Sequence, residues 1–115
     1  MQYLILIYGA EDAWAKMSPE QAAEVMGAYM AYTKALKAAG KHVAGDELQP
    51  TSTAKSITLR AGKTNVVDGP YVDTKESLGG YYLISVENEA EALEWASKCP
   101  AVLHGGVELR PVVMR

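Results

Sequence analysis

Residues 2–8, QYLILIY, form a strand-like segment that is apolar on both of its faces. Side chains alternate along a strand, so this segment presents two separate surfaces. One face carries Tyr3, Ile5 and Ile7, and the other carries Leu4, Leu6 and Tyr8. An apolar strand face must be covered by another layer of structure. A sheet that contains this strand therefore needs cover on both sides.

The longest periodic segment predicts a helix between Ser18 and Gly40. Ser18 can cap this helix, Pro19 suits its first turn, and Gln21 completes a capping box. Gly40 is the expected C-terminal glycine. The positions expected to face the core are Ala22, Val25, Met26, Tyr29, Met30, Thr33 and Leu36.

A second helix is predicted after Asn88, which can act as its cap, with Glu91 at the capping-box position. Pro100 stops this helix because proline cannot continue it. The inward positions of the second helix are Ala92, Trp95, Ala96 and Cys99.

The remaining segments predict strands and turns. Strands are expected at residues 41–48, 55–60, 64–67, 81–86 and 107–113. Residues 61–63 predict a tight hairpin turn, and residues 68–80 predict a loop that ends at Gly79 and Gly80. This order is typical of a ferredoxin-like α+β sandwich formed by one domain, residues 1–115, with both helices on one face of an antiparallel sheet.

Two helices cannot cover both faces of such a sheet. We therefore expect a homodimer whose sheets face each other, because a second copy is the simplest cover for the other apolar face. A cavity between the two sheets would be lined by the face away from the helices. The candidates for this lining are Tyr3 or Tyr8, one of Tyr81 and Tyr82, and Glu108 with Arg110.

Composition narrows the classes of function. Eleven basic and fourteen acidic residues give a net charge of −3 without a basic stripe, so direct nucleic-acid binding is not expected. No apolar run approaches the roughly 20 residues that span a bilayer, and the apolar start, Met1 to Tyr8, has no basic leader and no small-residue cleavage site. We therefore expect a cytoplasmic protein without a membrane partner. The single cysteine, Cys99, excludes an internal disulfide and a multi-cysteine metal site, and no cofactor is predicted.

The sequence DGPY at 68–71, continued by VDTKESLGGYY at 72–82, resembles the signature of the YCII-related proteins, in the branch named DGPF for its motif. Tyr71 stands where that motif has phenylalanine. The stretches 6–9, 45–50, 92–100 and 107–112 are also similar to the family, so the resemblance covers essentially the whole chain. It implies a dimeric α/β barrel, in agreement with the strand and helix pattern.

The resemblance further implies a relationship to small enzymes of aromatic degradation, and a His–Asp pair is the proposed active site in one branch of the family. The histidine of that pair falls in this chain at Ala28-Tyr29-Met30, where there is no histidine, and the acid falls near Asp46. Half of the pair is missing, so the activity is not carried over. DGPF proteins often accompany sigma factors in genomes, which implies a link to regulation.

Two carboxylates are candidates for a catalytic base. Asp46 follows Gly45 inside a strand, where an unpaired carboxylate is costly, which favours a pocket; the alternative is an edge position facing water. Asp68 could be held at a pocket mouth as a base or ligand anchor, or it could bond the backbone two residues on as part of a turn.

Other side chains are candidates for ligand binding. Lys75 and Glu76 could bind an anionic group and move a proton, or they could form a solvated surface pair. Lys75 and Arg110 could together hold an anionic group of the ligand. His104 could act as a base because histidine titrates near neutral pH. The tyrosines that suit a pocket wall, or ordinary core packing, include Tyr8, Tyr29 and Tyr71.

Three functions follow from these residues. The chain could be a small enzyme with a carboxylate base that acts on a small organic molecule at the dimer interface. It could be a non-catalytic ligand-binding or regulatory module that acts beside a transcription factor. A purely structural dimeric scaffold is the third reading.

Overall fold

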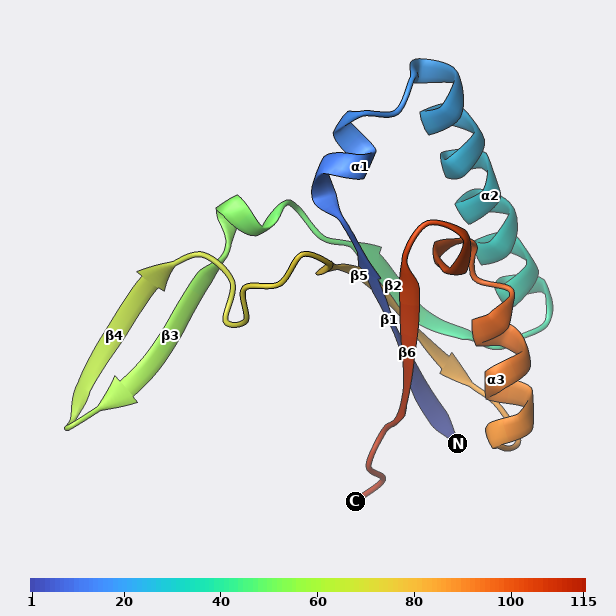
Figure 1. The fold of residues 1–115 in the computed structure, drawn as a ribbon. Helices are drawn as coiled ribbons and strands as arrows, with labels where there is room; N and C mark the ends of the chain where they lie inside the picture. The colour runs from blue at the N-terminus through green and yellow to red at the C-terminus, as the bar shows by residue number, and fades with distance from the viewer.

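The computed structural model describes residues 1–115 and contains a four-stranded antiparallel sheet with helices on one face (Figure 1). The elements are β1 (Gln2–Gly9), α1 (Glu11–Ala15), α2 (Pro19–Ala38), β2 (His42–Glu47), η1 (Thr51–Thr53), β3 (Lys55–Arg60), β4 (Lys63–Asp68), β5 (Ser77–Ser85), α3 (Glu89–Ser97), η2 (Pro100–Leu103) and β6 (Gly106–Pro111). The strand order is β2-β5-β1-β6. Two interleaved β-α-β units in this order make a ferredoxin-like α+β fold, which confirms the predicted class.

The core lies between this sheet and the helices α2 and α3. Its buried side chains are Tyr3, Ile5, Tyr32, Leu36, Tyr82, Ile84, Val86, Ala92, Ala96, Cys99 and Ala101. The hydroxyl of Tyr32 donates a hydrogen bond to the backbone carbonyl of Trp95 at 2.6 Å, so burial does not leave this polar atom without a partner. None of the helices combines the length and the hydrophobicity needed to cross a membrane.

Both ends of α2 follow the sequence prediction. The side chain of Ser18 accepts from the Gln21 backbone at 3.1 Å, and the Gln21 side chain accepts from the Ser18 backbone at 3.0 Å. Gly40, with a φ of 72°, ends the helix, and the Lys41 backbone donates to the carbonyl of Leu36 at 2.9 Å. These bonds satisfy backbone groups that an uncapped helix would leave open.

The prediction that Met26 and Met30 belong to the core was wrong. Met26 is 44% exposed and Met30 is 70% exposed. The buried residues of α2 are Tyr32 and Leu36. The rest of the predicted face is confirmed, since Ala22, Val25, Tyr29 and Thr33 are half-buried and Leu36 is buried; Tyr32 extends this face on the side opposite the two methionines.

β5 begins four residues earlier than the loop prediction allowed, so the loop does not extend to residue 80. The glycine pair 79–80 marks a bulge in the strand instead of its start. The register with β1 shifts between Ile7 and Tyr8, and a Cβ on the second glycine would lie 3.0 Å from the Asp46 carbonyl oxygen. Glycine is therefore required for close approach of β2 to β5 here.

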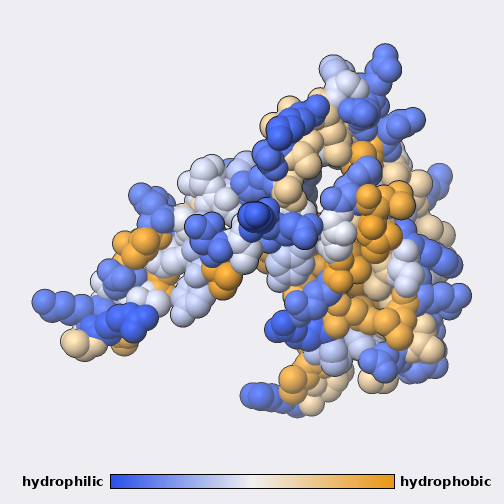
Figure 2. Space-filling view, in the orientation of Figure 1, coloured by the Kyte–Doolittle hydropathy of each residue, from blue (hydrophilic) through white to orange (hydrophobic).

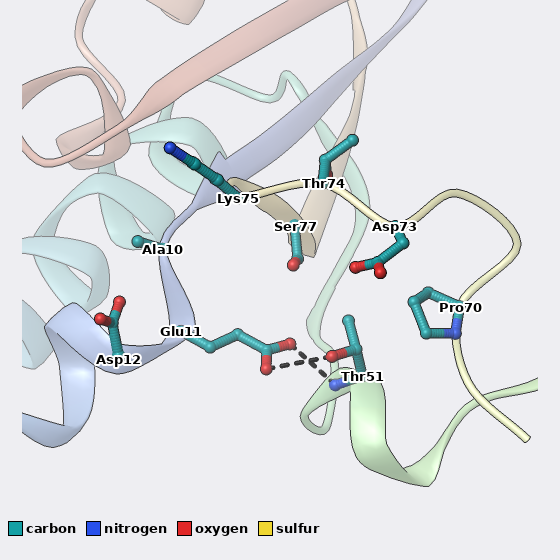
Figure 3. Close-up of a pocket in the computed structure, with 9 residues that line it drawn as sticks. All are labelled: Ala10, Glu11, Asp12, Thr51, Pro70, Asp73, Thr74, Lys75 and Ser77. Carbon is teal, nitrogen blue, oxygen red and sulfur yellow. Dashed lines mark hydrogen bonds between the residues drawn. The ribbon is translucent and has the colours of Figure 1, made fainter.

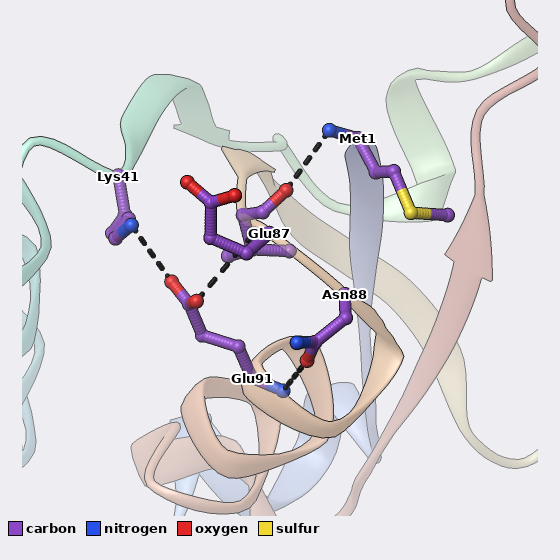
Figure 4. A network of polar contacts seen from close by, with 6 residues as sticks. Met1, Lys41, Glu87, Asn88 and Glu91 are labelled. Atoms are coloured by element: carbon purple, nitrogen blue, oxygen red, sulfur yellow. Dashed lines mark hydrogen bonds and ion pairs between the residues drawn. The ribbon is translucent and has the colours of Figure 1, made fainter.

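A polar network joins the start of β2 to the N-terminal end of α3 (Figure 4). Asn88 caps α3 by accepting from the Glu91 backbone at 3.0 Å. The Glu91 carboxylate forms an ion pair with Lys41 at 2.8 Å, and this contact lowers the pKa of Glu91. The amino group of Met1 donates to the carbonyl of Val86 at 2.9 Å. The network fixes the N-terminus beside the helix that covers the sheet.

β3 and β4 form a separate two-stranded sheet that projects from the body of the molecule (Figure 1). We call residues 55–68 the arm. Its turn places Ala61 and Gly62 at positive φ, 50° and 76°, as a two-residue hairpin turn requires. The radius of gyration is 16.1 Å, whereas a compact domain of this length would have roughly 13 Å. The projecting arm explains this extended shape.

Replacing Gly105 by alanine is expected to lower the free energy of unfolding by about 1–3 kcal/mol. A Cβ at Gly105 would overlap the carbonyl oxygen of Tyr8 and lie 3.0 Å from the Cα of Gly9, so the end of β1 would have to move. Gly106→Ala is the matched control, since nothing lies within 4 Å of a Cβ at Gly106. Urea denaturation measures both variants, and equal stabilities would contradict this close approach.

Candidate functional site

The face of the four-stranded sheet that points away from α2 and α3 brings together five of the residues predicted for the site or its lining. We call it the open face. The strand register arranges its side chains in two neighbouring rows across the sheet. One row consists of Asp46, Tyr81, Leu6 and Glu108, and the next consists of Ala44, Leu83, Leu4 and Arg110. Tyr8 continues the same face of β1 beyond Leu6.

Asp46 and Tyr81 form a polar pair at one side of the open face. The Tyr81 hydroxyl donates to Asp46 Oδ2 at 3.0 Å. This hydrogen bond raises the pKa of Tyr81, because the neighbouring carboxylate disfavours the phenolate. Tyr81 therefore stays protonated and orients the carboxylate. The second oxygen of Asp46 accepts no side-chain hydrogen bond from the protein and remains open to a ligand.

Glu108 and Arg110 form the polar pair at the other side. They lie two residues apart on β6, so their side chains leave the same face, and they form an ion pair. Arg110 is the more exposed partner, with 68% of its side chain accessible. Because neighbouring strands lie about 4.8 Å apart, the backbones of Asp46 and Glu108 are separated by roughly 14 Å across the sheet.

An apolar surface lies between these two polar pairs. It consists of Leu4, Leu6 and Leu83, and we call it the leucine floor. All three side chains are half-buried by their neighbours in the sheet, and no helix covers them. The open face thus presents an apolar floor with a carboxylate and phenol at one side and a carboxylate and guanidinium at the other.

The two candidate pairs of tyrosines divide between the faces. Tyr3 and Tyr82 are buried on the helix side, whereas Tyr8 and Tyr81 lie on the open face. A Cβ at Gly45 would lie 2.7 Å from the Tyr82 ring, so glycine at this position makes room for that ring. The Tyr82 and Thr33 hydroxyls are 2.7 Å apart, which satisfies both groups.

Tyr29 also lies on the helix side, and the sheet therefore separates it from Asp46. Burial raises the pKa of Tyr29 to about 12, with smaller contributions from Cys99, Tyr82 and Glu47. The acid that influences Tyr29 is thus Glu47 and not Asp46. Tyr29 also forms part of the wall of a shallow groove of about 430 Å³ on the surface of α2. The groove is lined by Met26, Tyr29, Met30, Thr33, Lys34 and Lys37.

Lys75 borders a polar cavity of about 460 Å³ at the end of β1 (Figure 3). Its lining residues are Ala10, Glu11, Asp12, Thr51, Pro70, Asp73, Thr74, Lys75 and Ser77. The carboxylate of Glu11 accepts from the backbone and hydroxyl of Thr51 at 2.8 and 3.1 Å. These bonds tie α1 to η1, where the chain leaves for the arm. Figure 3 shows Lys75 extending over Ala10, away from the carboxylate of Asp73.

Lys75 and Arg110 do not share one binding site within a chain. Lys75 lies two residues before Ser77, which pairs with Gly9 at the end of β1. Arg110 pairs with Leu4 near the start of β1. Five residues along a strand separate these positions by roughly 17 Å. Glu76 is exposed in the loop before β5.

The other candidates lie apart from the open face. Asp68 forms an ion pair with Lys55 at the base of the arm, and Gly69 follows in a turn with a φ of 113°. Tyr71 is 77% exposed. His104 is exposed in the turn between η2 and β6. No group of three or more histidine, cysteine, aspartate or glutamate side chains is arranged to hold a metal ion.

Sequence reasoning did not foresee the hydrogen bond between Tyr81 and Asp46 or the leucine floor. Alternation predicted the faces of single strands, but the rows depend on how strands are paired. The sequence contains no direct signal for the bulge at residues 79–80. This bulge shifts the register of β5 against β1, so that Ile7 pairs with Gly80 but Tyr8 pairs with Leu78. With that register known, each row follows from the alternation of side chains.

The Tyr29→Phe variant is expected to lose less stability than the unmodified protein as pH rises from 10 to about 12. In this range the folded protein retains the Tyr29 proton that the unfolded chain releases, because burial raises the pKa of Tyr29 to about 12. The resulting stabilisation is complete below pH 10 and disappears as pH approaches the folded pKa. Urea denaturation across this range measures the difference in slope.

Tyr71→Phe is the control for this experiment, because its ring is 77% exposed. It should follow the pH dependence of the unmodified protein. If Tyr29→Phe also followed it, the burial of the Tyr29 hydroxyl described above would be wrong.

Three comparisons place the chain among known proteins. Over 99% of its length it is 35% identical to the uncharacterized protein R00369 of Rhizobium meliloti (strain 1021), of which the match covers 94%. Its fold is similar to that of 5-chloro-2-hydroxyhydroquinone dehydrochlorinase (TftG) from Burkholderia phenoliruptrix AC1100, solved in complex with 2,5-dihydroxybenzoquinone. The TM-score is 0.56 at 19% identity, covering 100% of this chain and 96% of the other. The model of the YCII-related domain matches residues 1–114, and the chain belongs to the YCII-related family.

Proposed function

We propose that this protein binds a small, planar, hydroxylated organic molecule on the open face and that Asp46 acts there as a proton acceptor. The observation that carries the proposal is the arrangement of the leucine floor between the Asp46–Tyr81 pair and the Glu108–Arg110 pair. A ligand site generally combines an apolar surface with a few polar groups that fix the orientation of the ligand.

The leucine floor suits the flat face of a ring. Leu6 is directly paired with Tyr81 on one neighbouring strand and with Glu108 on the other. A ring on Leu6 would therefore have polar groups on both sides. A second copy facing the open face would exclude water from the opposite side of the ring, as in the dimeric barrel that we expect for this fold.

Asp46 has the contacts of an oriented base. Tyr81 holds one carboxylate oxygen, and the other oxygen can accept a hydrogen bond from a ligand hydroxyl. An anionic oxygen elsewhere on the ligand would compete with Glu108 for Arg110, whose guanidinium is largely exposed. Asp68 is a weaker candidate for the base because Lys55 neutralises it at the base of the arm.

The similarity in fold to the dehydrochlorinase TftG supports a ligand of this chemical class. That enzyme was solved with a dihydroxylated quinone, which is a flat ring bearing acidic hydroxyl groups. Within the YCII-related family we assign the chain to the DGPF-motif branch, on the residues DGPY at 68–71.

A second candidate function is ligand binding without catalysis, in association with transcription control. The observation that favours it is Tyr29, which occupies the region where one branch of the family has its proposed catalytic histidine. Burial raises the pKa of Tyr29 to about 12, so this side chain cannot act as a base near neutral pH. The two functions differ in whether a bound molecule is converted.

The first test is binding of 2,5-dihydroxybenzoquinone and a panel of hydroxylated benzenes, measured by calorimetry and followed by mass spectrometry for conversion. We expect saturable binding to the unmodified protein. Tyr81→Phe should weaken binding about tenfold, roughly 1.4 kcal/mol, because the Asp46 carboxylate that accepts the ligand hydroxyl loses the group that orients it. Asp46→Asn should lower the rate of any conversion by about 100-fold or more, because it removes the base.

Glu94→Gln is the matched control, since Glu94 is an exposed carboxylate on α3, on the helix side of the sheet. It should bind and convert ligands as the unmodified protein does. Binding without conversion, weakened by Tyr81→Phe, would favour the non-catalytic function. Binding and conversion that are unchanged in both Asp46→Asn and Tyr81→Phe would exclude the open face as the site.

A further inference from the structure

The arm presents an apolar face that the rest of the chain does not cover. Directly paired residues of β3 and β4 lie on the same face, so Ile57, Val66 and Leu59 are neighbours on one side of the ribbon. Ile57 is 63% exposed, Val66 57% and Leu59 72%. Figure 2 shows apolar residues on the projecting arm among polar ones. Contiguous exposed apolar side chains of this kind mark an interaction surface.

The base of the arm is held in a defined position. The Gly69 backbone donates to the carbonyl of Ala54 at 2.8 Å, and the Ser56 hydroxyl donates to the carbonyl of Gly69 at 2.8 Å. Lys55 and Asp68 close the same end with an ion pair. A two-stranded ribbon alone in water is marginally stable, so an arm built in this way needs a surface to pack against.

The direction of the arm identifies that surface. Figure 1 shows the helices on one side of the four-stranded sheet and the arm extending to the other side, which is the side of the open face. Figure 2 shows a hollow between the arm and the part of the body near the C-terminus. A molecule that covers the open face would therefore lie within reach of the arm.

The size of the open face also points to the arm as part of one interface. A stable protein–protein interface takes about 20–30 residues from each partner. The strands contribute roughly a dozen residues to the open face, which is too few for such an interface. The arm supplies additional apolar residues on the same side of the molecule.

We propose that the arm packs against a second copy of this chain, so that two arms clasp the two facing sheets. A two-fold interface uses the same surface on both copies, and each arm would therefore lie along the flank of the partner's sheet. The proposal rests on the sheet-to-sheet pairing of the proposed function. It adds that the apolar face of the arm is buried in the dimer.

The test is sedimentation equilibrium of the full chain and its arm variants. The unmodified protein should be a dimer at micromolar concentration. Leu59→Lys should weaken dimerisation about tenfold or more, because it places a charge in the apolar contact. Asn65→Lys is the matched control: Asn65 is exposed on the opposite face of the arm, and this variant should dimerise as the unmodified protein does.

The side chains of Leu59 and Asn65 are both exposed in a single chain, so both lysine variants should fold. Circular dichroism of each variant verifies this. A dimer that Leu59→Lys does not weaken would overturn the role of the arm, while the facing of the sheets and the ligand titrations would stand. A monomer at high micromolar concentration would overturn the arm contact as well. Equal weakening by Asn65→Lys would also overturn it, since the effect would then not depend on the apolar face.

Discussion

Apolar side chains on both faces of β1 are the constraint on which the rest of this structure depends. β1 lies inside the sheet, paired with β5 and β6, so its backbone groups are satisfied on both edges. Its remaining requirement is cover for the side chains. The helices α2 and α3 bury Tyr3 and Ile5, and they leave Leu4 and Leu6 on the opposite side without cover from this chain. The candidate site lies on the face of β1 that the helices of this chain leave uncovered.

The alternation of β5 gives two adjacent tyrosines different chemistry. Tyr82 packs edge-on against Tyr32, with ring centres 5.3 Å apart, and its hydroxyl meets Thr33. Tyr81 points the other way and donates to Asp46. Two adjacent positions of β5 thus hold a tyrosine that orients a carboxylate and a tyrosine that stabilises the core. A tyrosine is suited to both positions, because its ring is apolar and its hydroxyl needs a partner wherever it is placed.

Local signals predicted the parts of the fold that depend on a few neighbouring residues. The Ser18–Gln21 capping box, Gly40 and the turn at residues 61–63 each have a local cause and were confirmed. Predictions failed where contacts between distant residues decide the outcome. The glycines at 79–80 were interpreted as the end of a loop, whereas close approach to β2 places them within β5. Met26 and Met30 satisfied helical spacing, but they lie at the edge of the face that packs on the sheet, and the core takes in Tyr32 on its other edge.

The candidate site shows the same division. Asp46, Arg110 and Tyr8 were singled out from the sequence, and the register brings them to one face. The pairing of Glu108 with Arg110 follows from their spacing on one strand, but the contact between Asp46 and Tyr81 was not foreseen, since these residues lie 35 positions apart along the chain. Lys75 and Arg110 are not neighbours within one chain: Lys75 precedes β5 beside the end of β1 at Gly9, whereas Arg110 on β6 pairs with Leu4.

Cover and chemistry are coupled on the open face. In a single chain Asp46 is exposed, so water competes for its second oxygen and weakens its attraction to any ligand hydroxyl. A second sheet facing the leucine floor would remove that water and strengthen each polar contact with a bound ring. The same burial would stabilise the dimer through Leu4, Leu6 and Leu83. In the proposed dimer, the surface that is buried by assembly would therefore be the surface that binds the ligand, and an isolated chain would hold the residues of the site without their buried environment.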